Sequence, residues 1–316
     1  MTAELLLIGG ATPRMMDRFQ AEFTVHELRQ IENRAAFLAE RGAAITAVAT
    51  NGHDGVPADI MAALPNLQII SCYGVGYDAI DVETAVARGI VVTHTPDVLN
   101  DEVANTAILM MLALYRDFLA NESHARSGQW AVQGNAPLSR SPSRRTVGIL
   151  GLGRIGMTIA EKLQAFDAVI LYHARSQKDV GYTYYQNLIE MARDADILIV
   201  ITPGGAATRH LVDRRVLDAL GPEGTLINVA RGSVVDEAEL VLALKEGRLG
   251  YAGLDVFENE PMVPDELLSM QNVVLLPHVG SATVETRQAM GDLVCHNLSQ
   301  FLKDGSPVTP IPECRT

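Results

Sequence analysis

Three residues of complementary chemistry follow successive apolar segments in the second half of the chain. Arg231 lies in LINVARGSVVDE, Glu260 in GLDVFENEP and His278 in VVLLPHVGSAT. An arginine binds a carboxylate through paired N–H donors and polarises a nearby carbonyl, whereas a histidine exchanges a proton near neutral pH. A glutamate beside that histidine favours the imidazolium and orients the ring. Together with a hydride donor, these groups suffice to reduce a carbonyl.

The spacing of the three residues favours one shared site. Each taken alone also fits a structural role, and a Pro-His pair at the end of a strand is more often structural. All three, however, follow segments that read as consecutive strands of an open α/β sheet. Ligands of such sheets bind at the carboxyl ends of the strands, so we expect Arg231, Glu260 and His278 to converge.

A glycine-rich turn indicates the source of the hydride. The segment VGILGLGRIG places Gly151, Gly153 and Gly156 in the pattern GxGxxG, between a predicted strand and a predicted helix. The first glycine allows the tight turn, the second lets the backbone approach a pyrophosphate, and the third permits close helix packing. The helix N-terminus attracts the negative charge. A glycine-rich structural turn is the alternative, but the strand and helix in the expected order favour dinucleotide binding.

The next predicted strand, VILYH, ends without the acidic residue that usually binds the adenosine ribose of NAD. Ala174 takes that place, followed by Arg175 and Ser176. A planar guanidinium and a hydroxyl suit a phosphate dianion, and Arg154 in the glycine turn could face the same phosphate. We therefore predict a preference for NADP(H), with NAD(H) possible. The alternative is that Arg175 is a solvated residue at the end of a strand.

Short apolar runs alternate with helical patterns along the whole chain, which predicts a parallel α/β architecture. A first series of strands is predicted at ELLLIG, FTVHEL, AITAVAT, LQIISC and IVVTHT. A second series is predicted at VGILG, VILYH, DILIVI, TLINVA, AGLDVF and VVLLPH. These six segments match the sheet of a dinucleotide-binding domain.

Two long helical patterns determine the predicted domain organisation. One covers residues 101–128, with Asn100 or Asp101 as its cap, and is apolar on nearly every side, as expected of a helix buried between domains or subunits. Residues 129–146 read as a loop or extended arm. The last helix, 284–305, has no strand partner in the second series, so we assign it to the first domain.

The predicted domains follow from this assignment. A discontinuous substrate-binding domain comprises residues 1–98 and 285–316, and an NAD(P)-binding domain comprises residues 99–284. The second domain includes the helix and arm at about 101–146, which form the dimerisation element if the helix is buried between subunits.

Composition excludes several classes of function. The chain has 316 residues and a net charge of −13, which argues against a nucleic-acid or anionic-membrane partner. Its three cysteines lie far apart without a CxxC pair, so no metal site is predicted and a reduced compartment is indicated. The N-terminus lacks the pattern of a signal peptide, and no window is long and apolar enough to span a membrane. We expect a cytoplasmic protein.

The order of the motifs YGVGYDAID, GLGRIG, NVARGSVVDEAEL, GLDVFENEP and PHVGSAT resembles the D-isomer-specific 2-hydroxyacid dehydrogenase family over nearly the whole chain. The resemblance implies a Rossmann domain inserted in a split, flavodoxin-like substrate-binding domain, usually assembled as a homodimer. It implies that Arg231 binds the substrate carboxylate and carbonyl, and that His278 is the acid/base with Glu260 as its partner.

The resemblance also implies further ligand contacts. The backbone N–H groups of Gly74, Val75 and Gly76 would meet the substrate carboxylate. Thr202 and Pro203 match a loop along the cofactor, and Asp255 matches a residue near the nicotinamide carboxamide. Additional cofactor contacts are expected from Thr106, Ile155, Val229, Ala230 and Gly280.

The Arg-Ser pair after Ala174 is similar to that of the NADPH-dependent glyoxylate/hydroxypyruvate and hydroxyphenylpyruvate reductases. We expect reduction of a small 2-keto acid, glyoxylate or hydroxypyruvate, to the D-2-hydroxy acid. A D-lactate-type or aryl-pyruvate reductase is the alternative within enzymes, and the residues NGHDGVP and Leu99 are expected to set the pocket size. A non-catalytic dinucleotide-sensing protein is the alternative of another class; it needs flanking disordered tails, for which we expect no room here.

Overall fold

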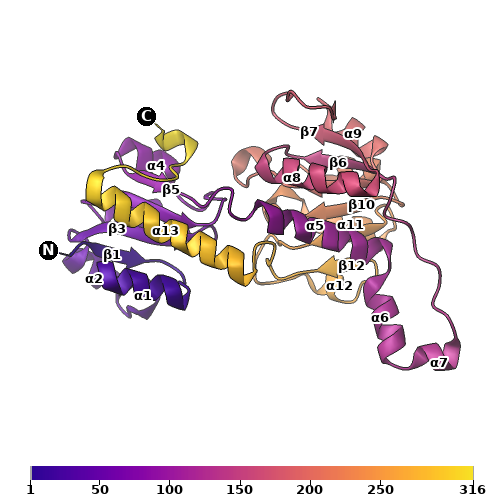
Figure 1. The fold of residues 1–316 in the computed structure, drawn as a ribbon, viewed down its shortest axis with the longest axis horizontal. Coiled ribbons are helices and arrows are strands. Elements are labelled where there is room, and N and C mark those ends of the chain that lie inside the picture. Colours follow the sequence, from indigo (N-terminus) through magenta and orange to yellow (C-terminus); the bar gives the residue numbers. More distant parts are fainter. Residues whose placement is uncertain (1, 316) are drawn as a thin grey trace. The chain divides into compact units, whose positions relative to one another are not determined.

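The computed structural model describes residues 2–315. The chain forms two compact units, one of residues 2–99 and 282–315 and the other of residues 100–281 (Figure 1). The first unit is therefore discontinuous in sequence, with the second unit inserted in it. Each unit is built on its own parallel β-sheet, and the predicted α/β fold class is confirmed.

The sheet of the first unit has the strand order β2-β1-β3-β4-β5, which is the order of flavodoxin-like folds. Every segment predicted as a strand in this part of the chain overlaps one of its strands. They are β1 (Glu4–Leu7), β2 (Thr24–Glu27), β3 (Ile45–Asn51), β4 (Ile69–Tyr73) and β5 (Val91–Thr93).

Helices cover this sheet, and side chains define where several of them begin. The Thr12 hydroxyl accepts a hydrogen bond from the Met15 N–H at 3.2 Å, and Pro13 occupies the first turn, a combination typical of a helix start. The last helix packs against β4 and α1, with Val294 and Leu298 fully buried (Figure 1). The helices are α1 (Pro13–Glu22), α2 (Arg34–Arg41), α3 (Ala58–Ala62), α4 (Val82–Ala87) and α13 (Val284–Asp304).

The sheet of the second unit has seven strands in the order β12-β11-β10-β9-β6-β7-β8. Successive strands run outward in opposite directions from the β6–β9 pair, which makes that pair the switch point where ligands of such sheets bind. The strands are β6 (Thr146–Leu150), β7 (Val169–His173), β8 (Thr183–Tyr184), β9 (Ile197–Val200), β10 (Thr225–Asn228), β11 (Tyr251–Leu254) and β12 (Val273–Leu275).

The prediction of six strands for this sheet was therefore wrong by one. The additional strand, β8, has two residues and pairs with β7 at the edge of the sheet through Leu171↔Thr183 and Tyr172↔Tyr184. A strand of two residues is too short to give an alternating pattern in the sequence.

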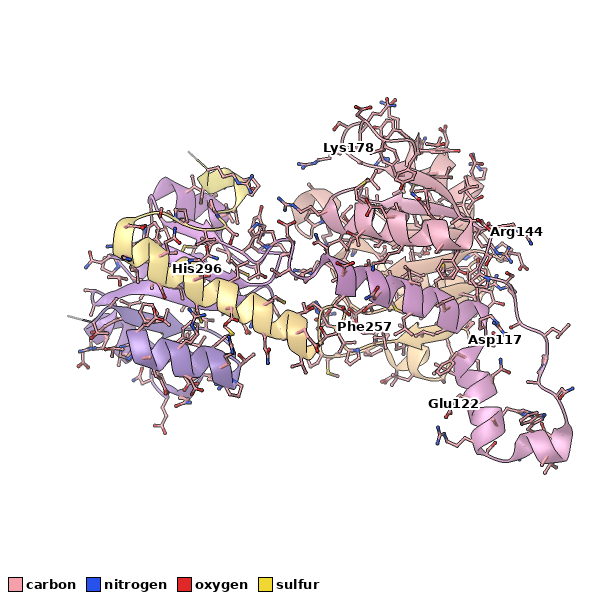
Figure 2. All side chains as sticks on the ribbon, in the orientation of Figure 1. Asp117, Glu122, Arg144, Lys178, Phe257 and His296 are labelled. Carbon is pink, nitrogen blue, oxygen red and sulfur yellow. The ribbon has the colours of Figure 1, made fainter. Side chains whose placement is uncertain are left out.

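The long helix predicted for residues 101–128 is also interrupted. It consists of α5 (Asn100–Tyr115) and α6 (Phe118–Arg126), bent by 63°. Asp117, labelled in Figure 2, lies between them with φ 46°, a left-handed conformation that ends a helix. The segment predicted as a loop begins with a further helix, α7 (Gln129–Gln133). The prediction of a single helix followed by a loop was wrong for this reason.

Only the first of these helices is buried as predicted. Met110 and Met111 of α5 are fully buried, and α5 packs beside α8 and against β11. In contrast, α6 and α7 extend away from the sheet of their unit, as Figure 1 shows. Within residues 2–315, no single helix is long and apolar enough to cross a membrane, although the bent pair α5 and α6 meets the criterion jointly.

The remaining helices of the second unit connect its strands and cover the faces of the sheet. One cluster of its core includes Leu198 and Leu226 from the strands and Leu217 from a helix, all fully buried. The helices are α8 (Arg154–Leu163), α9 (Leu188–Asp194), α10 (Arg214–Leu220), α11 (Glu237–Lys245) and α12 (Asp265–Leu268).

Candidate active site

The three residues predicted to carry chemistry follow three neighbouring strands. β10 pairs with β11 and β11 pairs with β12, all in parallel, with Asn228 opposite Leu254 and Leu254 opposite Leu275. The carboxyl ends of these strands therefore share one edge of the sheet. Arg231 follows the first strand, and Glu260 and His278 follow the other two.

Glu260 and His278 form a direct pair. The Nδ1 atom of His278 lies 2.7 Å from Oε2 of Glu260, and the side chains are 43% and 20% exposed. The other carboxylate oxygen, Oε1, accepts a hydrogen bond from the Phe257 N–H at 3.1 Å. The His278 N–H in turn donates to the Asp255 carbonyl at 2.8 Å. Both members of the pair are thus oriented by the backbone, and the imidazole presents Nε2 as its second nitrogen.

Arg231 is fixed by a turn at the end of β10. The buried Asn228 donates from Nδ2 to the Arg231 carbonyl at 3.0 Å and accepts from the Ala230 N–H at 3.1 Å. The following residue, Gly232, permits a close backbone approach, because a Cβ there would lie 1.9 Å from the carbonyl carbon of Phe257. The turn that carries Arg231 therefore packs directly on the loop that carries Glu260.

A network of charged residues holds the loop that carries Glu260. No pattern in the sequence predicted this network. The Glu258 carboxylate accepts hydrogen bonds from Arg209 at 2.6 Å and His210 at 3.0 Å. The Glu258 N–H donates to the Glu237 carboxylate at 3.0 Å. The only sequence signal was the position of Glu258, two residues before Glu260.

The two carboxylates of this network have opposite pKa shifts. Burial alone would raise the pKa of Glu258, but hydrogen bonds from His210 and Arg209 outweigh it and hold that pKa below the ordinary value. Burial raises the pKa of Glu237, and the nearby Glu258 and Glu260 carboxylates add to the shift. Glu258 is thus the member held firmly as an anion.

Asp255 and Thr106, both expected to contact the cofactor, hold the turn that follows His278. The Asp255 carboxylate is 2% exposed and accepts from the N–H groups of Val279 and Gly280 at 2.7 and 2.8 Å. Burial raises its pKa even though these hydrogen bonds oppose the shift. The Thr106 hydroxyl donates to the Gly280 carbonyl at 3.3 Å. Thr106, Asp255 and Gly280 are therefore brought together beside the catalytic candidate His278.

The glycine turn between β6 and α8 has the shape that a dinucleotide requires. A Cβ at Gly151, whose φ is +105°, would lie 2.9 Å from the Ile201 carbonyl, and one at Gly156 would lie 2.2 Å from the Gly151 carbonyl. A Cβ at Gly153 would meet no atom within 4 Å. The first and third glycines are thus required by packing, whereas the second borders open space.

The start of α8 adds hydrogen-bond donors to that space. The side chain of the N-cap residue, Gly153, makes no hydrogen bond to this helix, and the first turn of a helix presents backbone N–H groups that an anion can bind. Open space beside Gly153 and an uncapped helix N-terminus both fit a pyrophosphate. The residues present are therefore those that would hold a dinucleotide.

The Ala174–Ser176 segment lies at the same edge as the glycine turn. β6 pairs with β7 so that Leu150 is opposite His173, and the Gly151 N–H donates to the His173 carbonyl at 2.9 Å. Arg175 and Ser176 are exposed, and within residues 2–315 their side chains form no hydrogen bond or ion pair. Their polar groups are consequently available to a ligand beside the turn.

The other predicted cofactor residues follow neighbouring strands of this sheet. Thr202 and Pro203 come after β9, and Val229 and Ala230 come after β10. Thr202 contacts the glycine turn closely, since a Cβ at Gly151 would lie 3.0 Å from its Cγ2 atom. All four residues therefore lie on the carboxyl edge that carries the glycine turn.

The predicted substrate loop, Gly74–Gly76, follows β4 of the first unit. Its backbone is held from within that unit: Thr95 N–H donates to the Gly74 carbonyl at 2.9 Å, and His94 Nδ1 lies 3.0 Å from the Val75 carbonyl. The Gly74 N–H donates to the Cys72 carbonyl at 3.1 Å. Of the three N–H groups expected to meet a carboxylate, those of Val75 and Gly76 make no backbone hydrogen bond within residues 2–315.

Comparison with known proteins agrees with this arrangement. Residues 108–280 match the family described as D-isomer specific 2-hydroxyacid dehydrogenase, NAD binding domain. The chain belongs to this family.

Several named reductases are similar to this chain over most of their length. A hydroxyphenylpyruvate reductase of Plectranthus scutellarioides is 49% identical, over 87% of this chain and 88% of its own. A glyoxylate/hydroxypyruvate reductase of Arabidopsis thaliana is 51% identical, over 84% and 85%. Among solved structures, an NADPH-dependent glyoxylate/hydroxypyruvate reductase of Sinorhizobium meliloti, in complex with NADP and malonate, is 46% identical with a TM-score of 0.92, over 99% and 98%.

The arrangement of these residues fits oxidoreduction by a 2-hydroxyacid dehydrogenase. An oriented His–Glu pair can hold and release a proton at Nε2, and an arginine on the neighbouring strand can bind the anionic end of the substrate. The adjoining glycine turn and helix N-terminus provide the dinucleotide site. The chain is thus an oxidoreductase of this family with an NAD(P)-binding Rossmann unit.

Proposed function

We propose that this dehydrogenase uses NADPH to reduce a small 2-keto acid, glyoxylate or hydroxypyruvate, to its D-2-hydroxy acid. The observation that carries the proposal is the 2.7 Å contact between His278 and Glu260, at the sheet edge that also bears Arg231. The similarity to reductases of glyoxylate and hydroxypyruvate supports the substrate class.

In this proposal each residue has one chemical task. Arg231 binds the substrate carboxylate and polarises the keto oxygen, with the Val75 and Gly76 N–H groups as further donors to the carboxylate. Bound NADPH supplies the hydride that the keto carbon accepts. His278 donates its Nε2 proton to the oxygen, while Glu260 stabilises the imidazolium before the transfer and orients the ring throughout.

The cofactor would be held by the residues at the carboxyl edge of the second sheet. The glycine turn and the α8 N-terminus bind the pyrophosphate, and Arg175, Ser176 and Arg154 bind the 2′-phosphate. NADH would bind without the phosphate contact and hence more weakly. The remaining contacts would come from Thr106, Ile155, Thr202, Pro203, Val229, Ala230, Asp255 and Gly280.

An aryl-pyruvate reductase is the second candidate function. It is favoured by the 49% identity to the hydroxyphenylpyruvate reductase of P. scutellarioides. The two candidates share the catalytic residues and the cofactor, and differ in the size of side chain that the substrate carries.

We also propose a homodimer, in the cytoplasm. The support is a group of exposed apolar side chains on α6, α7 and the segment that follows them, in the part of the chain expected to dimerise. They are Phe118, Leu119, Trp130, Val132 and Leu138, between 56% and 101% exposed. Exposed apolar groups of this kind mark association surfaces.

The catalytic part of the proposal is tested by His278→Ala. We expect kcat for glyoxylate reduction to fall by roughly 10²- to 10⁴-fold, the usual contribution of a general acid, while the Kd for NADPH stays within about twofold because the ring is assigned to substrate and not to cofactor. The matched control is His296→Ala, an exposed histidine on α13 that Figure 2 labels. Turnover of the His278→Ala enzyme equal to that of the control would refute the assignment.

A further inference from the structure

The loop between β7 and β8 carries the proposed phosphate ligands but has no regular structure of its own. Residues 174–182 form neither helix nor strand, and the side chains of residues 175–179 are exposed. Figure 2 labels Lys178 on this loop. A loop of this kind pays a conformational-entropy cost when a ligand orders it, unless the protein has already fixed its backbone.

One tyrosine hydroxyl fixes the loop at Lys178. Tyr172, in β7, is fully buried, and its hydroxyl accepts a hydrogen bond from the Lys178 N–H at 2.8 Å. The same hydroxyl donates to the Lys178 carbonyl at 3.3 Å. The backbone N–H and carbonyl of Lys178 are therefore both bound to the Tyr172 side chain, which is held in place because it is buried in the core of the sheet.

A second tyrosine fixes the loop at its other end. The Tyr184 hydroxyl, from β8, donates to the Ala174 carbonyl at 3.3 Å. Tyr172 and Tyr184 are register partners on adjacent strands, and their ring centroids lie 5.3 Å apart. The two attachment points, Ala174 and Lys178, enclose Arg175 and Ser176, so a contacting pair of tyrosines restrains the backbone on either side of both.

We propose that Tyr172 and Tyr184 are positioning residues that determine selectivity for the 2′-phosphate of the cofactor. They touch neither the cofactor nor the substrate; they hold the Arg175–Ser176 segment in its binding conformation before the ligand arrives. NADH lacks the phosphate, so its binding does not depend on the conformation of this segment. Loss of a hydroxyl should therefore weaken the binding only of ligands that carry a 2′-phosphate.

The inference rests on the proposed function, in which Arg175 and Ser176 bind that phosphate. A purely structural role for the hydroxyls predicts something different. Loss of a hydroxyl would then lower thermal stability, or weaken the binding of every adenine nucleotide equally. The ratio of the affinities for nucleotides with and without the 2′-phosphate would not change. The ratio is consequently the quantity to measure.

The test uses the full-length enzyme and its variants Tyr172→Phe and Tyr184→Phe, with adenosine 2′,5′-bisphosphate and 5′-AMP as probes in calorimetric titrations. From the net free energy that one hydrogen bond contributes, we expect each variant to bind the bisphosphate about three- to tenfold more weakly. Binding of 5′-AMP should change by less than about twofold, and the KM values for NADPH and NADH should diverge in the same way. Tyr185→Phe is the control, because its hydroxyl binds Asp194 outside the loop.

Two outcomes would overturn the inference. One is an unchanged ratio of bisphosphate to 5′-AMP affinity in both folded variants, and the other is equal weakening of the two probes. Tyr184 is only partly buried, so its variant is informative even where Tyr172→Phe fails to fold. If the wild-type enzyme itself binds both probes equally, the proposed NADPH preference fails as well; if it prefers the bisphosphate and the variants do too, only the role of the tyrosines fails.

Discussion

In the proposed function, Arg175 is the residue on which cofactor choice depends most directly. Its guanidinium is exposed, and in the described part of the chain it makes no ion pair, so it keeps its donors for a ligand. A carboxylate at the preceding position would repel a phosphate dianion, and Ala174 removes that repulsion. Under the proposed function, discrimination between the two cofactors would therefore follow from two adjacent side chains.

Replacing Arg175 by alanine should weaken NADPH far more than NADH. A hydrogen bond to a charged group contributes about 1.5–3 kcal/mol, which corresponds to roughly 10- to 150-fold in Kd. Fluorescence titration with each cofactor measures the effect. Arg193→Ala is a suitable control, because Arg193 lies in the last turn of α9, just before the amino end of β9 and opposite the binding edge. Equal loss of both cofactors would argue against a phosphate contact.

At the scale of elements, the loop between β11 and α12 shows how Glu260, the proposed partner of His278, is positioned by other residues of the loop and its surroundings. Glu258 is bound by Arg209 and His210, and its N–H is bound by Glu237. These contacts leave Glu260, two residues later, oriented toward His278. A network of this kind limits the conformations of the loop, so its energetic contribution appears in both stability and turnover.

Glu258→Gln should lower the free energy of unfolding by about 1.5–3 kcal/mol at pH 7, since two charge-assisted hydrogen bonds are weakened. The folded-state pKa of Glu258 is depressed, so its stabilisation is complete above the unfolded pKa of about 4.3 and is lost as the pH falls through the lower folded value. Denaturant unfolding at pH 7 and pH 3 measures this. A stability difference that is the same at both pH values would contradict the assigned charge state.

The strands and their parallel arrangement could be predicted because each is an apolar run between helical patterns. The site edge followed from chain order, since Arg231, Glu260 and His278 come after successive strands. Other features depend on tertiary contacts and had no local signal. The break at Asp117 arises from one left-handed residue, and β8 from a two-residue pairing.

The contacts that orient the site could not be predicted for the same reason. Glu258 meets Arg209 and His210 from 49 and 48 residues earlier in the chain, and nothing in the local pattern of either segment indicates the pairing. Likewise, the hydrogen bonds from the Val279 and Gly280 N–H groups to the Asp255 carboxylate had no local signal in the sequence. The sequence indicated the candidate site residues more readily than the hydrogen bonds that position them.

At the scale of the whole molecule, the proposed homodimer makes a prediction about the exposed apolar side chains of the α6–α7 region. Trp130 and Val132 are 62% and 79% exposed. Trp130→Glu combined with Val132→Asp should convert the dimer into a monomer, because charges at an apolar interface are costly to bury. Light scattering after size-exclusion chromatography measures the mass, and Leu268→Glu, an exposed apolar position on α12, is the control. A wild-type protein that is monomeric at micromolar concentration would refute the dimer.

The central claim, an NADPH-dependent reductase of small 2-keto acids, is tested most directly by one set of initial rates. The wild-type enzyme is assayed with glyoxylate, hydroxypyruvate, pyruvate and phenylpyruvate, each with NADPH and with NADH. We predict the highest kcat/KM for glyoxylate or hydroxypyruvate with NADPH, and at least a roughly tenfold lower value with NADH, as expected from loss of one charged contact. Highest activity with phenylpyruvate would favour the aryl-pyruvate reductase. Equal rates with both cofactors, or no reduction of any keto acid, would contradict the account.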